Sequence, residues 1–237
     1  MLILLAGPAT KLFEHLHAVP KVYVADVAWG RETDTGDAGG RVVAEGDPAL
    51  ATPAALDAAL PPLLGWQEQI PPSTSNKRVR GERAWVLHHR GEQVELPPSR
   101  VYLHAAEWLA HRPGVSRLRL TSSGGYYVRS LARDLGRAVG ARAHLVRLHR
   151  TAIGPWTDPG RRIRTVTGPA MVPWMRTLLV GPVEVGQAVG GPFVPAAYTL
   201  PEGFPAVDTL RLVRDGELVG LASDGVVRVS IGSVCRE

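Results

Sequence analysis

The chain is poor in the residues that build disulfides and thiolate metal centres, and it has no long apolar run. Its 237 residues include one cysteine, Cys235, so no disulfide can form within the chain. This usage is typical of a reducing compartment, and we expect a cytoplasmic protein. The apolar residues 1–6 follow no basic residue and are too few for a signal sequence or a membrane span. We expect them to form a core strand or helix, and we expect no membrane association.

Lysine is also scarce. Only Lys11, Lys21 and Lys77 occur among 27 basic residues, so arginine supplies most of the formal net charge of +5. A basic balance favours an anionic partner. A GC-rich genome would enrich arginine too, but it would scatter the arginines, whereas these bunch between Arg78 and Arg150. The clustering therefore favours a function in anion binding.

Common metal and nucleotide motifs are absent from the sequence. His88 and His89 are adjacent and point apart in regular structure, and no histidine has a carboxylate at ligand spacing. The acidic residues of loop 31–40 do not have the spacing of a calcium loop. Residues 122–125 resemble a phosphate-binding turn, but neither Gly-x-x-x-x-Gly-Lys nor Gly-x-Gly-x-x-Gly is present. These patterns do not support a zinc, calcium or nucleotide site.

Hydrophobic periodicity predicts an alternation of strands and helices in the first two thirds of the chain. We expect strands over residues 21–29, 101–108, 115–120 and 143–148, helices over 52–60 and 127–139, and a polar connecting loop over 31–40. Thr52 has the right position to cap the first helix, with Pro53 at its first turn. The turn between the second and third strands is expected at residues 111–114.

The last third has a different pattern. Short apolar runs at residues 183–189, 209–213, 217–222 and 226–231 are separated by Gly and Asp turns. Such spacing predicts a small β-barrel or sandwich. The pattern is weak between residues 158 and 183, where Pro-Gly and Gly-Pro pairs indicate a linker. The 45% hydrophobic content is enough for a main domain with a small module.

The most informative stretch is residues 121–139. Basic residues recur on one face of its predicted helix at Arg129, Arg133 and Arg137. Apolar residues form a second face at Val128, Leu131, Leu135 and Val139. We expect the apolar face to pack on the core and the basic face to point outward, where it suits a phosphate backbone. An ordinary amphipathic surface helix is the alternative interpretation.

A second basic segment lies in residues 69–83. Its entry is stiffened by Pro71 and Pro72, and its tip carries Lys77, Arg78 and Arg80. We interpret it as a loop that reaches out to an acidic partner, and a solvated surface loop fits the same local composition.

Tyrosine, arginine and leucine occur at three predicted strand ends or junctions. Tyr23 lies on the first strand, Tyr127 and Arg129 at a strand-to-helix junction, and Leu148 near another strand end. Tyrosine offers a stacking face and a hydroxyl, arginine a bidentate fork and leucine an apolar wall. Together they predict a pocket for a planar base beside an anion.

The order of these segments resembles that of bacterial tRNA pseudouridine-55 synthases of the TruB type. The resemblance runs from Met1 to about Trp156, and its segments are residues 9–11, 21–25, 30–40, 69–72, 127–136 and 148–154. The tail from about Val183 resembles the PUA-like RNA-binding module of such enzymes. The resemblance implies an α+β fold: a mixed, mainly antiparallel sheet with flanking helices in residues 1–165, a linker in 166–182, and a β-rich module in 183–237.

The resemblance also implies an isomerase that needs no metal or organic cofactor. In that family a uridine of the tRNA T-loop, at position 55, is flipped into the pocket, and an aspartate attacks the nucleoside so that the base detaches, turns and rejoins through carbon. The expected partner is the T-arm of tRNA, and we expect a monomer.

Several residues match family positions. Tyr23 matches the tyrosine that stacks on the base and is a candidate for proton transfer, Arg129 the arginine that pairs with the nucleophilic aspartate, and Tyr127 and Leu148 residues of the pocket. Residues 70–90 resemble the loop that closes over the RNA. The expected RNA contacts are Lys77, Arg78, Arg80, Arg133 and Arg150.

The chain departs from the family at the nucleophile. A Gly-Thr-Leu-Asp-Pro-like motif would fall about half a dozen residues before Met1, and none of Asp26, Asp34 or Asp37 is in its place. Lesser departures are Gly124 for a usual lysine and residues 73–76 for Tyr-Ser-Ala. The first hypothesis is an RNA-modifying enzyme whose start lies upstream. Alternatives are a catalytically inactive tRNA-binding protein or chaperone of the same fold, and a structural or protein-partner role.

Overall fold

The computed structural model of the protein describes residues 1–205 and 208–231, and Cys235 lies outside this part. The chain forms two compact units: Lys21–Thr151, and Met1–Pro20 together with Ala152–Glu237. The sequence suggested divisions at residues 165 and 183, which stay a prediction. Pro-Gly punctuation reports turns, whereas a compact unit is defined by packing between distant segments, and the two need not coincide.

The Lys21–Thr151 unit is built on strands of a sheet with the order β10-β9-β1-β8-β7-β4. These strands are β1 (Lys21–Trp29), β4 (Gly65–Gln69), β7 (Ser99–Arg112), β8 (Val115–Ser122), β9 (Ala143–Ile153) and β10 (Trp156–Thr157), of which β10 and the end of β9 belong to the other unit. The β1–β8, β7–β8 and β4–β7 pairs are antiparallel. All four strands that the sequence predicted are confirmed, and β7 and β9 extend beyond their predicted ends.

The hairpin between β7 and β8 turns within two residues, because Arg112 pairs with Val115. Gly114 adopts φ +72°, a conformation that other residues rarely take. The turn is therefore shorter than the four residues expected from the sequence.

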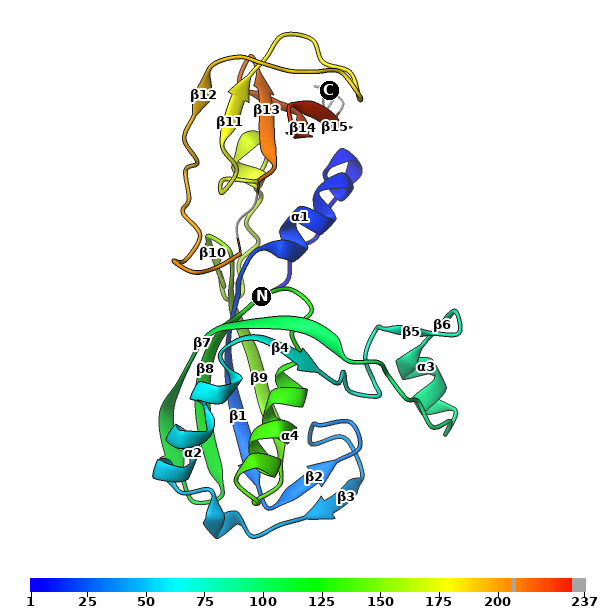
Figure 1. Cartoon of the computed structure of the whole chain (residues 1–237), viewed down its shortest axis with the longest axis vertical. Helices are drawn as coiled ribbons and strands as arrows, with labels where there is room; N and C mark the ends of the chain where they lie inside the picture. The colour runs from blue at the N-terminus through cyan, green and yellow to red at the C-terminus, as the bar shows by residue number, and fades with distance from the viewer. Residues whose placement is uncertain (206–207, 232–237) are drawn as a thin grey trace. The chain divides into compact units, whose positions relative to one another are not determined.

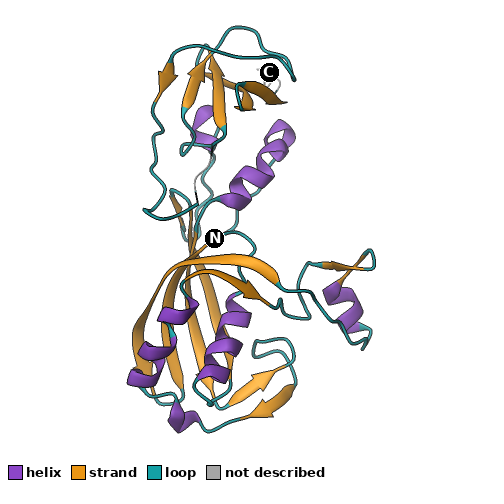
Figure 2. Ribbon diagram, in the orientation of Figure 1, coloured by secondary structure: helices purple, strands orange, loops and turns teal. Residues whose placement is uncertain are grey.

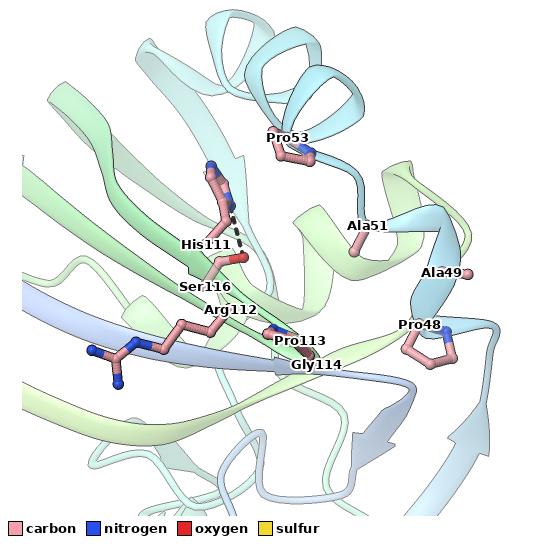
Figure 3. Close-up of a pocket in the computed structure, with 9 residues that line it drawn as sticks. All are labelled: Pro48, Ala49, Ala51, Pro53, His111, Arg112, Pro113, Gly114 and Ser116. Atoms are coloured by element: carbon pink, nitrogen blue, oxygen red, sulfur yellow. Dashed lines mark hydrogen bonds between the residues drawn. The ribbon is translucent and has the colours of Figure 1, made fainter.

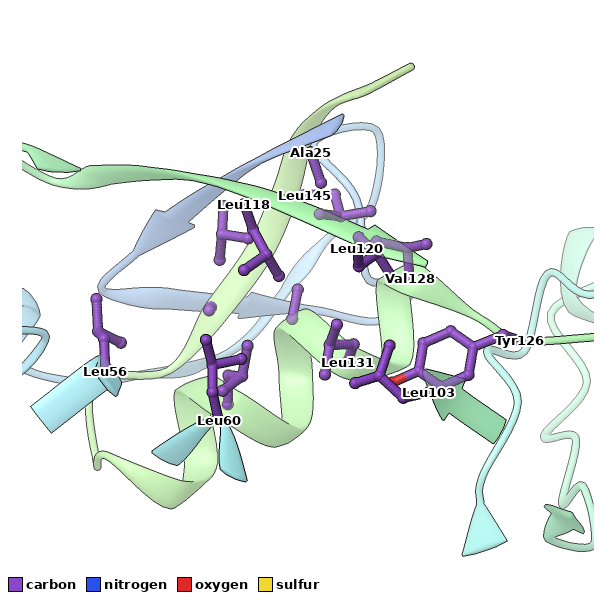
Figure 4. Packing of buried hydrophobic residues seen from close by; sticks show 14 of the residues in the cluster. Ala25, Leu56, Leu60, Leu103, Leu118, Leu120, Tyr126, Val128, Leu131 and Leu145 are labelled. Atoms are coloured by element: carbon purple, nitrogen blue, oxygen red, sulfur yellow. The ribbon is translucent and has the colours of Figure 1, made fainter. Parts of the chain in front are cut away.

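Two helices cover one face of this sheet (Figure 2), α2 (Pro53–Ala59) and α4 (Val128–Ala138). The Thr52 hydroxyl accepts a hydrogen bond from the Ala55 N–H at 3.2 Å, so the predicted cap is confirmed. The apolar face of α4 packs into the main core through Val128, Leu131 and Leu135. Figure 4 shows Val128 and Leu131 in this core together with Leu103 of β7, Leu118 and Leu120 of β8, and Leu56 and Leu60.

A small hairpin follows β1 and consists of β2 (Arg31–Thr33) and β3 (Val42–Glu45). Arg31–Thr33 were expected in a polar loop, and that prediction is wrong. The reason is Glu32, a buried carboxylate that accepts hydrogen bonds from Arg137 and Arg142. A polar residue can occupy a strand when its charge is paired in this way.

An arm projects from the sheet between β4 and β7 (Figure 1) and comprises residues 70–98. It contains β5 (Arg78–Val79), β6 (Glu82–Arg83) and α3 (Ala84–His89). Arg80 and Gly81 form its tip with φ +52° and +86°, a pattern found in two-residue hairpin turns.

The other unit holds a five-stranded sheet with the order β12-β11-β13-β14-β15. Its elements are α1 (Phe13–Ala18), β11 (Thr177–Leu179), β12 (Phe193–Val194), β13 (Leu210–Arg214), β14 (Glu217–Ser223) and β15 (Val226–Ser230), with 3-10 turns at Gly7–Leu12 and Gly168–Met171. Its core includes Leu12, Leu16, Trp174 and Leu221. The β-rich tail is confirmed, and β13 pairs with β11 in parallel.

Two predictions for this unit are wrong. Residues 183–189 form no strand; Ala188 makes only an isolated bridge to Val226. Residues 1–6 form neither strand nor helix, although Met1, Ile3 and Leu5 pack against a core while Leu2 and Leu4 are exposed. In both segments the apolar alternation is present, but strand assignment needs a hydrogen-bonded neighbour along its length. The α+β class with a mainly antiparallel sheet is confirmed.

Candidate functional site

The start of α4 is fixed by a reciprocal amide pair. The Gln69 side chain at the end of β4 accepts a hydrogen bond from the Tyr127 N–H at 2.8 Å and donates to the Tyr127 carbonyl at 3.1 Å. Gln69 is almost fully buried, so leaving either group unpaired would be costly. This pair holds the residue that precedes α4 in an extended conformation and sets where Arg129 points.

Arg129 lies one residue into α4 and joins two loops. Its Nη1 donates to the Thr35 carbonyl at 3.0 Å, to Asp37 Oδ2 at 3.2 Å and to the Thr74 hydroxyl. We call Arg129, Thr35, Asp37 and Thr74 the Arg129 cluster. The resemblance pairs Arg129 with the family's nucleophilic aspartate, and that pairing stays a prediction. The carboxylate that Arg129 contacts within the described residues is Asp37, which is not in the place of that nucleophile.

The loop that carries Asp37 is held by its own hydrogen bonds. The Thr33 hydroxyl donates to the Asp37 carbonyl at 2.7 Å, and Asp37 Oδ1 accepts from the Thr35 hydroxyl at 2.8 Å and the Gly39 N–H at 3.1 Å. Gly36 has φ +74°, and a Cβ there would lie 3.1 Å from Cβ of Arg129. The glycine therefore permits the loop to press directly against α4.

The two tyrosines of the predicted pocket have different surroundings. Tyr23 is half-buried on β1 and packs against the main core. Tyr127 is half-buried at the start of α4, and burial raises the pKa of its phenol, an effect that Ser75 and then the charge of Arg129 partly oppose. The Tyr127 hydroxyl is therefore neutral at ordinary pH and can donate a hydrogen bond.

Leu148 and Arg150 belong to β9, which neighbours β1 in the sheet. Leu148 is 46% exposed, so its side chain is available to a ligand. Arg150 lies close enough to Lys21 to act on it electrostatically. Burial, and then this like charge, lower the pKa of Lys21 to about 8.

The basic face of α4 does not point outward as a whole, and that prediction is wrong. Arg133 is 16% exposed at its side chain and donates to Asp134 and to the Ile70 carbonyl. Arg137 makes a bidentate pair with buried Glu32. The arginines share one face of the helix, as predicted, but two of their acceptors, the Ile70 carbonyl and Glu32, lie 63 and 105 residues away in the chain. The role of Arg133 in RNA binding stays a prediction.

The arm presents its cations differently. Lys77, Arg78 and Arg80 are exposed, and Arg78 donates only to the Gly81 carbonyl. Among the described residues no ion pair involves any of these three side chains. Their exposure agrees with both interpretations of this segment, and their role as RNA contacts stays a prediction.

A surface hollow of about 430 Å³ lies at the opposite end of the sheet (Figure 3). It is lined by Pro48, Ala49, Ala51, Pro53, His111, Arg112, Pro113, Gly114 and Ser116. Ser116 pairs with Val27 of β1, four residues from Tyr23 and so about 13 Å along the strand. This hollow is therefore separate from the candidate site, and no predicted site residue lines it.

Within the described residues, no group of three or more histidine, cysteine, aspartate or glutamate side chains could hold a metal ion. In the same part of the chain, no helix combines the length and the apolar character needed to span a bilayer.

Comparison with known proteins decides the family. The model for TruB family pseudouridylate synthases (N terminal domain) matches residues 1–128, more than half of the chain. The chain belongs to the TruB family.

Curated TruB relatives match a little under two thirds of the chain. The tRNA pseudouridine synthase B of Symbiobacterium thermophilum is 41% identical over 153 residues, which are 63% of this chain and 51% of that protein. The Paracoccus denitrificans protein of the same name is 42% identical over 150 residues, 63% of this chain and 50% of its own. The chain thus spans about half the length of the curated relatives it matches.

Solved structures support the fold. A chain from a Cbf5-Nop10-Gar1 complex superposes with a TM-score of 0.54 at 15% identity. The match covers 94% of this chain and 68% of the other chain. A chain from an H/ACA RNP bound to a substrate RNA containing 2'-deoxyuridine gives 0.52 at 14% identity, covering 95% and 68%. Both matches extend over the tail, which the family model leaves out. The pseudouridine synthase-like fold expected from the sequence is confirmed.

Proposed function

We propose that the chain is part of an enzyme that isomerises uridine to pseudouridine in tRNA, at position 55 of the T-loop, and that binds the T-arm as a monomer. The nucleophile would come from the family's aspartate motif, which the 237 residues do not contain. The observation that carries this proposal is the Arg129 cluster, which fixes a guanidinium between two loops at the start of α4 and beside Tyr127. Two facts support the proposal: the chain belongs to the TruB family, and Arg129 and Tyr127 are residue types that suit the expected chemistry. The expected cytoplasmic location stays a prediction.

The reaction moves one bond and needs no redox partner. The C1′–N1 bond of uridine breaks and a C1′–C5 bond forms, while C5 loses a proton and N1 gains one, so atoms and charge balance. The nucleophile expected from the family is an aspartate carboxylate that attacks the nucleoside and is released when the base rejoins. The base must leave its stack to reach the pocket.

Arg129 has donors left to orient such a carboxylate. Its Nη1 serves the three acceptors of the cluster, Nη2 makes one long contact of 3.5 Å to the Thr74 carbonyl, and Nε donates to no described residue. A planar guanidinium can bind a second carboxylate through the Nε and Nη2 edge. We propose that Asp37 holds Arg129 from one side while the nucleophile pairs with it on the other.

Tyr23 is proposed to stack on the flipped base and to take part in proton transfer. It lies on a central strand and packs against the core, so its ring position is set by rigid structure. Tyr127 and Leu148 are proposed as further walls of the pocket. The hydroxyl of Tyr127 suits the polar edge of uracil, and the apolar side chain of Leu148 suits its face.

Tritium release from tRNA labelled at C5 of uridine tests this function. We expect no release by the 237-residue chain alone and release by a version extended upstream through the family's aspartate motif, with Tyr23→Ala abolishing the gain. Acid–base groups alone supply only about 10²–10⁴-fold acceleration, too little to replace a nucleophile. Strong release by the unextended chain would show that another carboxylate acts.

A second candidate is tRNA binding without catalysis. It is favoured by the state of Asp37, whose Oδ1 accepts two hydrogen bonds and whose Oδ2 faces Arg129. A carboxylate restrained in this way is a poor nucleophile. Salt-sensitive tRNA binding with no tritium release from either form would support this candidate and remove the first.

A further inference from the structure

A row of aromatic side chains lies on β4 and β7, outside the site described above. Trp66 is 53% exposed, and its ring centroid lies 5.2 Å from that of Tyr102, which is 6.4 Å from the ring of His104. Trp66 and Tyr102 face each other directly in the strand register. We call Trp66, Tyr102 and His104 the aromatic strip.

The strip faces away from the helices. Along β7, Val101 and Leu103 are buried in the core beneath α4, whereas Arg100, Tyr102 and His104 alternate with them and so lie on the other face. A base that stacks on this strip cannot be the one that enters the pocket beside Arg129. The strip is therefore a second surface.

A cation is held over the strip. The guanidinium carbon of Arg100 lies 4.5 Å from the centroid of the Trp66 ring. Glu68 is the register partner of Arg100, yet no ion pair joins them among the described residues. An arginine that stacks on a ring keeps its edge donors available for an anion.

The position of the strip links it to the arm. β4 ends at Gln69 and β7 begins at Ser99, and these two residues are paired, so the arm leaves and returns one pair beyond Arg100. The exposed cations Lys77, Arg78 and Arg80 thus belong to the segment that emerges from the end of the strip. A polyanion bound to the arm would pass close to this edge of the sheet.

We propose that the aromatic strip is a second RNA contact, on which an unpaired base stacks while Arg100 binds an adjacent phosphate. This inference rests on the proposed function, because it takes RNA as the partner. Exposed aromatic rings beside arginine form the stacking platforms of proteins that bind single-stranded nucleic acid. A stable protein interface needs about 800 Å² from each partner with an apolar centre, and a strip of three rings beside Arg100 and Glu68 does not supply it.

The test is the affinity of the full chain for a tRNA transcript, measured by filter binding across a salt series. Trp66→Ala is expected to weaken binding between about 5- and 100-fold, the range for loss of one base–aromatic stack, with an unchanged salt slope. Trp66→Phe should retain most of the affinity. Arg100→Ala should lower the salt slope by about 0.7 to 0.9, one phosphate contact. The matched control is Leu109→Ala, which removes an exposed side chain elsewhere on β7.

The outcomes separate the two proposals. If the unmodified chain binds tRNA and Trp66→Ala binds equally well, the strip is not an RNA contact and the proposed function stands. If the unmodified chain does not bind tRNA, the proposed function fails and the strip proposal fails with it. Ultraviolet crosslinking of the unmodified chain gives a readout that needs no variant: a crosslink on Trp66 or Tyr102 supports the strip. Crosslinks confined to the arm would overturn the strip proposal. It would also be overturned if Trp66→Ala lost the binding of a protein partner and kept its affinity for RNA.

Discussion

The start of α4 and the arm both carry arginine, yet the two regions use its charge in opposite ways. Arg129 is 24% exposed at its side chain, and its nearest acceptors are a carboxylate, a carbonyl and a hydroxyl of the protein. Arg80 sits at a hairpin tip with no ion pair in the described part of the chain. An arginine bound by fixed acceptors can orient a reacting group, whereas an exposed one adds salt-sensitive affinity.

The comparison predicts that Arg129 serves catalysis far more than binding. In a form of the enzyme that releases tritium, Arg129→Ala should lower turnover by about 100-fold or more, the typical loss when one preorganised donor is removed. Affinity for tRNA should change less than about threefold, because one screened contact contributes little.

The measurements are single-turnover tritium release and filter binding on the same protein. Arg129→Lys is the matched variant: it keeps the charge but loses the planar fork, so we expect it to recover little activity. Equal losses of turnover and affinity would mean that Arg129 is simply another phosphate contact, and the contrast between the two regions would disappear.

Lys21 sharpens the comparison, because it is a cation in the protein interior rather than on the arm. Burial, followed by Arg150, lowers its pKa to about 8 from 10.5. Between these values the unfolded chain binds more protons than the folded one, so stability should rise as pH increases from about 8 to 10.5. Below pH 8 the folded chain carries the full cost of burying the charged Lys21 ammonium, up to about 3 kcal/mol of the free energy of unfolding.

Lys21→Met removes this cost. Urea unfolding at pH 7, 9 and 10.5 should show the variant more stable than the unmodified chain at pH 7, with the difference closing toward pH 10.5. Lys77→Met is a suitable control, since Lys77 is exposed. A constant difference across the three pH values would mean that the ammonium of Lys21 is not desolvated in the folded chain.

Sequence reasoning found the local features of this molecule and missed those that join distant segments. The two faces of α4 and the Thr52 cap follow from spacing within a few residues, and both were predicted. The Gln69–Tyr127 pair spans 58 residues and the Arg129–Asp37 pair 92, so no local pattern reveals either. Gly36 was the available signal for the second, because a glycine inside a polar loop often marks a close backbone approach.

The same limit explains the wrong orientation of the basic face. Helical spacing correctly put Arg129, Arg133 and Arg137 on one side, but it could not show that Glu32 and the Ile70 carbonyl cover that side. The aromatic strip was missed for a related reason. Trp66 and Tyr102 lie 36 positions apart and meet only through the register of β4 and β7. The arm cations could be predicted because nothing in the fold covers them.

The smallest effect is expected when the arm is changed. Replacing Lys77, Arg78 and Arg80 together with alanine should weaken tRNA binding about tenfold near physiological salt and lower the salt slope by about two to three, since each phosphate contact contributes about 0.7 to 0.9. Stability in urea should stay within about 0.5 kcal/mol, because these side chains are exposed and form no ion pair with a described residue. Turnover at saturating tRNA should be unchanged, the reverse of the Arg129→Ala pattern.

The control is Arg211, whose guanidinium is buried and donates to Thr177 and to the Pro169 carbonyl. Arg211→Ala removes one positive charge, a third of the charge that the triple variant removes, and it should reduce stability and leave the salt slope unchanged. If instead the triple variant lost turnover while keeping its affinity, the arm would act on the chemistry, and the division of labour between the two basic regions would be wrong.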